Sequence, residues 1–170
     1  MRQPPGPQPV ANADALFAAQ SVNGAALAAL ATTAVLNAAW VWMAAMSGKF
    51  FPWFSVIQGW LIGIAVQRRG RGLDWRFPAM AAAIAVLGSF SGGFFVALAT
   101  TVTELEAGPL RILRGLTWNT WKIYFVEVVN PLDFVYAVAA AGLAAFYAGR
   151  RLLRHEVLAL RRTAGKTFDE

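Results

Sequence analysis

Cysteine is missing from this 170-residue chain, and histidine occurs once, as His155. The lack of cysteine excludes disulfides, thiolate nucleophiles and cysteine-ligated metal ions. A single histidine argues against a histidine-based zinc or haem site within one chain, and against a Ser-His-Asp triad. Charged residues are also scarce, at 14%, where an ordinary soluble domain has about a quarter. We therefore expect a protein that is not an enzyme and that holds no cofactor or metal ion.

What the chain does have is apolar sequence, because 58% of its residues are hydrophobic. Four long apolar stretches cover residues 25–46, 50–66, 77–100 and 132–149. Stretches of about 20 apolar residues are typical of transmembrane helices. The sequence therefore predicts an all-α, polytopic membrane protein with four transmembrane helices. Its predicted parts are a proline-rich flexible tail with a short interfacial helix (1–24), a four-helix transmembrane domain (25–149) and a basic amphipathic cytoplasmic tail (150–170).

The segment between the third and fourth stretches, residues 104–130, is too polar to cross a membrane. Trp118 and Trp121 alternate there with basic residues, a pattern that favours the membrane surface. We expect an interfacial amphipathic segment on the outer side of the membrane. The pattern leaves open whether this segment is a helix, a strand or a re-entrant loop.

Arginine clusters follow the second and fourth stretches, and they predict the orientation of the chain. Their members include Arg68, Arg69, Arg71, Arg150, Arg151 and Arg154. Basic residues beside apolar spans mark the cytoplasmic side, so both termini are predicted to lie in the cytoplasm. The same clusters should contact anionic lipid head groups, which explains the net charge of +6 without nucleic-acid binding. Together with the alanine- and arginine-rich composition, this predicts a multi-pass protein of a bacterial inner membrane.

Two pairs of glycines lie four residues apart inside apolar stretches: Gly59 with Gly63, and Gly88 with Gly92. Such G-x-x-x-G spacing makes a smooth strip on a helix, on which another helix can pack closely. We predict that both strips are packing surfaces. The partner could be another helix of this chain or another subunit.

Asn37 and Gln58 are the polar side chains placed most deeply in the apolar stretches. Hydrogen bonding between helices is the expected role of such buried amides, and lining a substrate path is the alternative. No ionisable residue lies in the middle of a stretch, which argues against a proton relay or an ion-coupled carrier. Four carboxylates fall near the outer ends of the stretches, at Glu104, Glu106, Glu127 and Asp133. We interpret these carboxylates as solvated loop residues rather than as catalytic groups of an enzyme that acts on lipid.

Residues 50–150 contain FFPWFSVIQGWLIGIAV, a glycine-arginine turn and PLDFVY at the start of the last stretch. In these features the chain resembles a loose family of small bacterial inner-membrane proteins with four spans. The resemblance implies four helices and supplies no catalytic residues. We therefore expect an accessory or assembly subunit that packs against other membrane proteins or against itself. A small oligomeric channel or solute carrier is the alternative.

Overall fold

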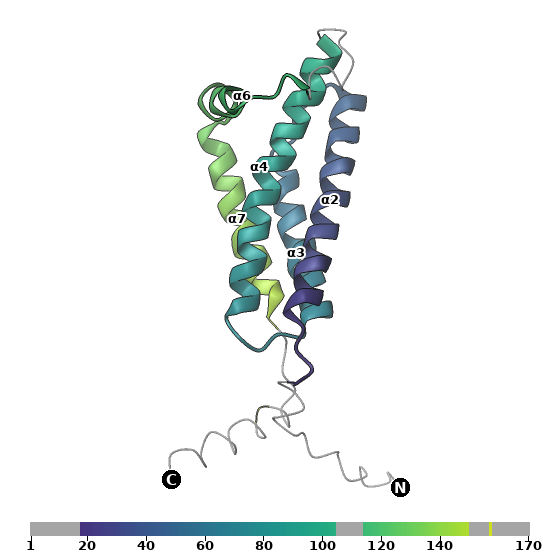
Figure 1. Ribbon diagram of the computed structural model, residues 1–170, viewed down its shortest axis with the longest axis vertical. Helices are drawn as coiled ribbons and strands as arrows, with labels where there is room; N and C mark the ends of the chain where they lie inside the picture. Colours follow the sequence, from purple (N-terminus) through teal and green to yellow (C-terminus); the bar gives the residue numbers. More distant parts are fainter. Residues whose placement is uncertain (1–17, 105–113, 150–156, 158–170) are drawn as a thin grey trace, which may run out of the picture.

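The computed structural model describes residues 18–104 and 114–149 together with Val157, and the elements it describes are all helical. The four long helices are α2 (Val22–Ser47), α3 (Phe54–Gly70), α4 (Arg76–Glu104) and α7 (Pro131–Ala148). They run side by side, and successive helices point in opposite directions (Figure 1). α3 and α4 form the central pair, because each contacts both α2 and α7 as well as the other.

Local sequence fixes both ends of α2 and the start of α7. Ser21 caps α2, because its Oγ accepts a hydrogen bond from the Gly24 backbone N–H at 3.1 Å. Gly48 ends the same helix with a left-handed φ of 66°, and its N–H donates to the Ala44 carbonyl at 2.8 Å. A capping box between Asn130 and Asp133 starts α7.

Among the described residues, three helices are long and apolar enough to cross a membrane: Val22–Ser47, Arg76–Val102 and Pro131–Ala148. The sequence predicted four such helices. α3 has 17 residues, which corresponds to about 25 Å at 1.5 Å per residue, less than the hydrocarbon core of about 30 Å.

The bounds predicted for the second span are also wrong. Residues 51–53 form a turn, in which the Phe54 N–H donates to the Phe51 carbonyl at 3.1 Å, so the helix begins at Phe54. It then continues through the polar residues Gln67 and Arg68 as far as Gly70.

Small side chains fill much of the interior of the bundle, and many large apolar ones face outward. Alanine dominates the buried core, at Ala25, Ala29, Ala81, Ala85, Ala140, Ala144 and Ala148. By contrast, Leu27, Val138 and Phe146 are each about 70% exposed. Small interior residues let helix backbones approach closely, and an apolar exterior suits a lipid environment. The arrangement agrees with a membrane protein.

The described part of the segment between α4 and α7 contains two consecutive helical elements. α6 (Trp118–Ile123) continues directly into η1, a π-helix (Tyr124–Val128). α6 lies across the bundle and is seen nearly end-on in Figure 1. We call this end of the molecule the α6 end. The opposite end carries Arg68, Arg69, Arg71 and Arg76, and we call it the arginine end.

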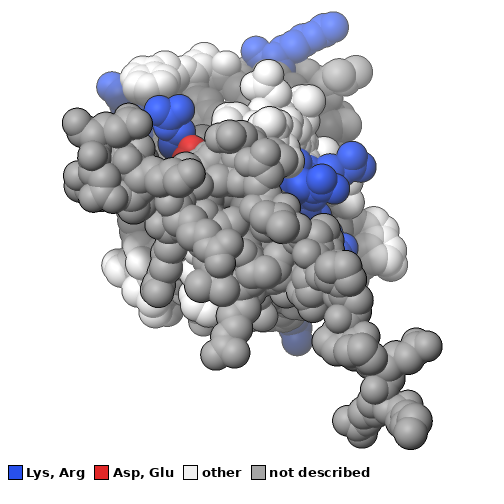
Figure 2. All heavy atoms as spheres, turned by 90° about the horizontal axis from the view of Figure 1, so that it is seen from below, with Lys and Arg blue, Asp and Glu red and all other residues white. Residues whose placement is uncertain are grey.

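Seen from the arginine end, basic side chains stand around the edge of the molecule and very little acidic surface is visible (Figure 2). Arg68 and Arg69 occupy the last turn of α3, and both are exposed. Residues 1–17 of the predicted tail, the arginines after α7 (Arg150, Arg151 and Arg154) and Glu106 lie outside the described residues.

Candidate functional site

A chain of hydrogen bonds joins three helices in the middle of the bundle. The Gln58 Nε2 of α3 donates to the Asn37 Oδ1 of α2 at 2.9 Å, and the Asn37 Nδ2 donates to the Ser91 Oγ of α4 at 3.0 Å. Gln58 is fully buried, and Asn37 is 8% exposed. The two amides that stand out in the sequence thus bond to each other, across helices of one chain.

The glycines of α4 make room for these amides. A Cβ at Gly88 would lie 2.7 Å from the Gln58 Nε2, and one at Gly92 would lie 2.7 Å from the Asn37 Oδ1. A Cβ at Gly92 would also lie 2.7 Å from the ring of Trp40. The Gly88–Gly92 strip therefore packs against polar side chains and an indole. The sequence predicted that it would pack against the backbone of another helix.

The glycines of α3 have a different partner, namely the backbone of α7. A Cβ at Gly59 would overlap the carbonyl oxygen of Ala140, and one at Gly63 would lie 2.7 Å from the carbonyl oxygen of Ala144. At the arginine end, the Gln67 Nε2 donates to the Gly149 carbonyl at 2.9 Å. Both glycine strips thus pack against residues of this chain.

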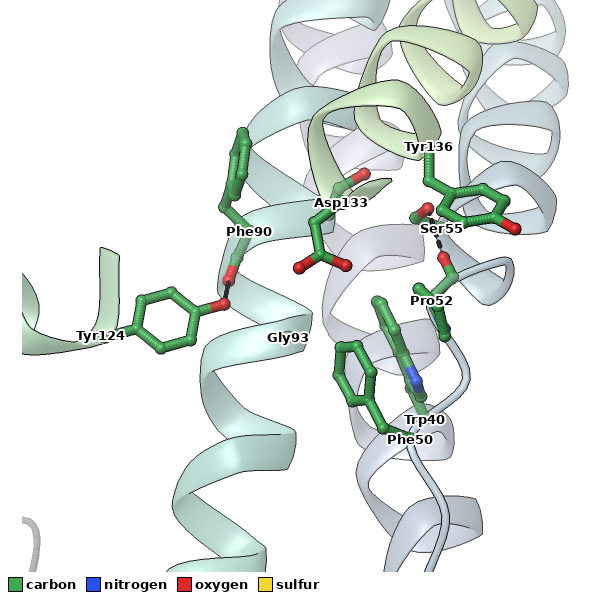
Figure 3. A pocket seen from close by; sticks show the side chains of 10 residues that line it. Trp40, Phe50, Pro52, Ser55, Phe90, Gly93, Tyr124, Asp133 and Tyr136 are labelled. Carbon is green, nitrogen blue, oxygen red and sulfur yellow. Dashed lines mark hydrogen bonds between the residues drawn. The ribbon is translucent and has the colours of Figure 1, made fainter. Parts of the chain in front are cut away.

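A small polar cavity lies toward the α6 end, one helical turn from the amides (Figure 3). Its volume is about 20 Å³, which is room for a single water molecule. The lining residues come from α2, the α2–α3 turn, α3, α4, η1 and α7: Trp40, Phe50, Pro52, Ser55, Ser89, Phe90, Gly93, Tyr124, Asp133 and Tyr136. The carboxylate of Asp133 projects from α7 toward Trp40 and Phe50 (Figure 3).

Three of the hydroxyls around this cavity, those of Ser55, Ser89 and Tyr124, already donate to backbone carbonyls. Ser55 donates to Pro52 at 2.8 Å, Ser89 donates to Ala85 at 2.8 Å, and Tyr124 donates to Phe90 at 3.2 Å. These hydroxyls can therefore offer only lone pairs to a guest. Asp133 accepts the N–H of Asn130 at 2.8 Å, so one of its oxygens serves the start of α7.

Two buried polar atoms in this region have no hydrogen-bond partner: Trp40 Nε1 and Gln58 Oε1. Trp40 is 2% exposed and lines the cavity. A buried N–H without a partner costs free energy, and a water molecule in a polar cavity of this size is the usual remedy. The cavity is thus suited to hold a small polar guest. It shows no pairing of a nucleophile with a base among the described residues.

Tyr124 offers a direct test of the electrostatics at the α6 end. Burial, and after it the negative charge of Asp133, raises the pKa of Tyr124 from 10.0 to about 12. Because the folded state keeps this proton longer than the unfolded chain does, folding stability should fall as the pH rises from 10 toward 12. Asp133→Asn should lower the pKa of Tyr124 only part of the way back toward 10.0, because burial is the larger cause of the increase.

Absorbance of the phenolate during an alkaline titration measures this pKa, and the Tyr124→Phe variant identifies which part of the signal belongs to Tyr124. A Tyr124 signal that already titrates at the ordinary tyrosine pKa of about 10 would contradict the buried geometry.

The two interfacial tryptophans have different surroundings. Trp121 stacks on Phe94 of α4, with ring centroids 4.0 Å apart and an angle of 13° between the planes. Trp118 is 76% exposed. Trp121 therefore attaches α6 to α4, whereas Trp118 is free to contact the surroundings of the bundle at this end.

Of the four carboxylates singled out in the sequence, Glu127 and Asp133 have described side chains, and these two have different surroundings. Glu127 is exposed on η1, and Asp133 lies in the cavity at the start of α7. α4 ends at Glu104. Among the described residues, no group of three or more histidine, aspartate or glutamate side chains is placed to hold a metal ion. No protein-family model matches this chain, and the searches of curated proteins and of solved structures likewise find no match.

Proposed function

We propose that this protein is a non-enzymatic subunit of a bacterial inner membrane, which packs against a transmembrane helix of a partner membrane protein. The observation that carries the proposal is a large apolar groove between α2 and α4, with a volume of about 800 Å³. It is lined by Ala34, Asn37, Ala38, Val41, Trp42 and Ala45 of α2 and by Phe95, Leu98, Ala99 and Val102 of α4.

The lining of this α2–α4 groove suits an apolar helix. Ala34, Ala38 and Ala45 recur at intervals of four and seven residues, so they lie along one face of α2. Small residues at such spacing let a second backbone approach and gain dispersion contacts. None of the described residues that line the groove is charged, which favours an apolar occupant.

The proposal also includes the orientation and the number of crossings. α3 lies between α2 and α7 as one of the central pair, and this placement supports a fourth crossing despite its length. The arginine end would face the cytoplasm, because basic residues are retained on that side. The Trp118 side chain at the α6 end would then lie at the outer surface.

Blocking the groove tests the proposal. Ala38→Trp should fill the groove and reduce co-purification of the partner in mild detergent by about tenfold or more, since a well-packed interface does not accept an added indole. Ala139→Trp is the matched control, because Ala139 is an exposed alanine of α7.

Mass identification of proteins that co-purify gives the measurement, and it distinguishes a foreign partner from a second copy of this chain. The proposal stands if one membrane protein is lost with Ala38→Trp and kept with Ala139→Trp. Equal recovery with both variants, or recovery of the chain alone in every case, would overturn it.

An oligomeric channel has less support. Asn37, Gln58 and Ser91 would have to line its path, yet they bond to one another inside a single chain. Their polar groups are therefore largely committed to holding α2, α3 and α4 together.

A further inference from the structure

A second groove lies between α2 and α3 at the arginine end. Its volume is about 540 Å³. Gly24, Leu27, Ala28, Ala31 and Thr32 of α2 and Ala65, Arg68 and Arg69 of α3 line it. It therefore has small and apolar residues along most of its length and two guanidinium groups at one end.

The geometry of this α2–α3 groove is fixed by a contact between helix ends. The Ser21 N–H, just before α2, donates to the carbonyl of Gly70 at the end of α3 at 3.0 Å. The start of α2 thus lies beside the last turn of α3, which carries both arginines. α2 has no acidic residue in its first turn. The positive end of its helix dipole is therefore unopposed there.

Both arginines are exposed, so their guanidinium groups are available to a ligand. A guanidinium binds a phosphate through two parallel N–H···O bonds, and the start of a helix also favours an anion. An apolar channel that leads into such a site matches a molecule with a phosphate head and a hydrocarbon tail. The α2–α4 groove differs in this respect, because none of the described residues that line it is charged.

We propose that the α2–α3 groove binds one anionic phospholipid, with its phosphate against Arg68 and Arg69 and one acyl chain along Leu27, Ala31 and Ala65. The site would prefer this lipid to a zwitterionic one. The head group of the anionic lipid has a net negative charge, whereas that of the zwitterionic lipid also carries a positive group, which the two arginines would repel. This inference does not depend on the proposed partner, which would occupy a different stretch of α2, from Ala34 to Ala45.

Native mass spectrometry of the purified full chain tests the site. The probes are phosphatidylglycerol and phosphatidylcholine with identical acyl chains, added to the protein in mild detergent. The Arg68→Gln/Arg69→Gln variant should lower phosphatidylglycerol occupancy by roughly tenfold to thirtyfold, since each basic residue near an anionic lipid surface strengthens binding by about fivefold. The Arg71→Gln/Arg76→Gln variant removes the same charge from the same end, but these residues do not line the groove. It should change occupancy by less than about threefold.

The apolar half of the site needs its own variant. Ala31→Phe keeps every charge and fills the groove at an exposed position. It too should lower phosphatidylglycerol occupancy. Equal losses with the two arginine pairs would show attraction to overall surface charge and would overturn the proposal. So would equal binding of the two lipids by the unaltered protein, or an Ala31→Phe variant with unchanged occupancy. A thermal unfolding scan of each variant confirms that the bundle is folded.

Discussion

Replacement of Gly59 by valine is expected to prevent the bundle from assembling. A Cβ at this position overlaps the carbonyl oxygen, carbonyl carbon and Cα of Ala140. All three are backbone atoms of α7, so no side-chain rotation can relieve the overlap, and the two γ-methyl groups of valine add to it. α3 and α7 would have to move apart along their whole contact, and in a close-packed interior such a shift is costly. We expect a loss of about 3 kcal/mol or more in folding free energy.

Gly142→Val provides the matched control for this prediction. Gly142 lies on α7, and a Cβ there meets no atom within 4 Å. The same substitution should therefore leave stability nearly unchanged, or raise it slightly, because glycine is a poor helix former. The yield of monodisperse protein in detergent and its thermal unfolding temperature give the measurement. Similar behaviour of the two variants would mean that α3 and α7 do not pack as described.

Hydropathy predicts α2, α4 and α7 well, because a membrane-spanning helix must be long and apolar whatever its neighbours are. The predicted stretch 25–46 lies within α2 (Val22–Ser47), and 132–149 nearly coincides with α7. α3 departs from the prediction because tertiary contacts set its end. The ring of Phe77 lies against Gly70 and Gly72, where a side chain would overlap it. Local sequence shows only a glycine-arginine turn there.

The sequence identifies Gly59, Gly63, Gly88 and Gly92 as positions without side chains, but it cannot show what fills the space. The structure assigns the first two to the backbone of α7 and the other two to Gln58, Asn37 and neighbouring side chains. Spacing along one helix is the same in both cases, so only the arrangement of the other helices distinguishes them.

The cavity near the α6 end is still harder to predict. Trp40, Ser89, Tyr124 and Asp133 come from four separate elements, and no two of them belong to a common motif. The sequence places Asp133 correctly in the first turn of the last helix, where it completes a capping box. Its approach to Trp40 depends on how α2, α4 and α7 pack. No local pattern contains that information.

The hydrogen-bond chain through Asn37 leads to the second large effect. Asn37→Leu should cost about 2 kcal/mol, because it leaves the Gln58 amide buried without a partner at either Nε2 or Oε1. Ser91→Ala removes the bond from the Asn37 Nδ2 and the 3.2 Å bond that the Ser91 hydroxyl donates to the Gly88 carbonyl, which already accepts within its helix, and should cost about 1 kcal/mol or less. Asn37→Leu should cost more than Ser91→Ala because Asn37 bonds to both Gln58 and Ser91.

The double variant Asn37→Leu/Gln58→Leu should be more stable than the sum of its two single variants implies, by about 1 kcal/mol or more. Removing both amides leaves neither buried alone, and the replaced side chains have similar volumes. Reversible unfolding of all three variants in mixed detergent micelles measures this coupling. Strictly additive losses would mean that the Asn37–Gln58 bond is absent from the folded protein. A coupling of the expected sign would identify these amides as a structural link among α2, α3 and α4, and would count against a role in lining a solute path.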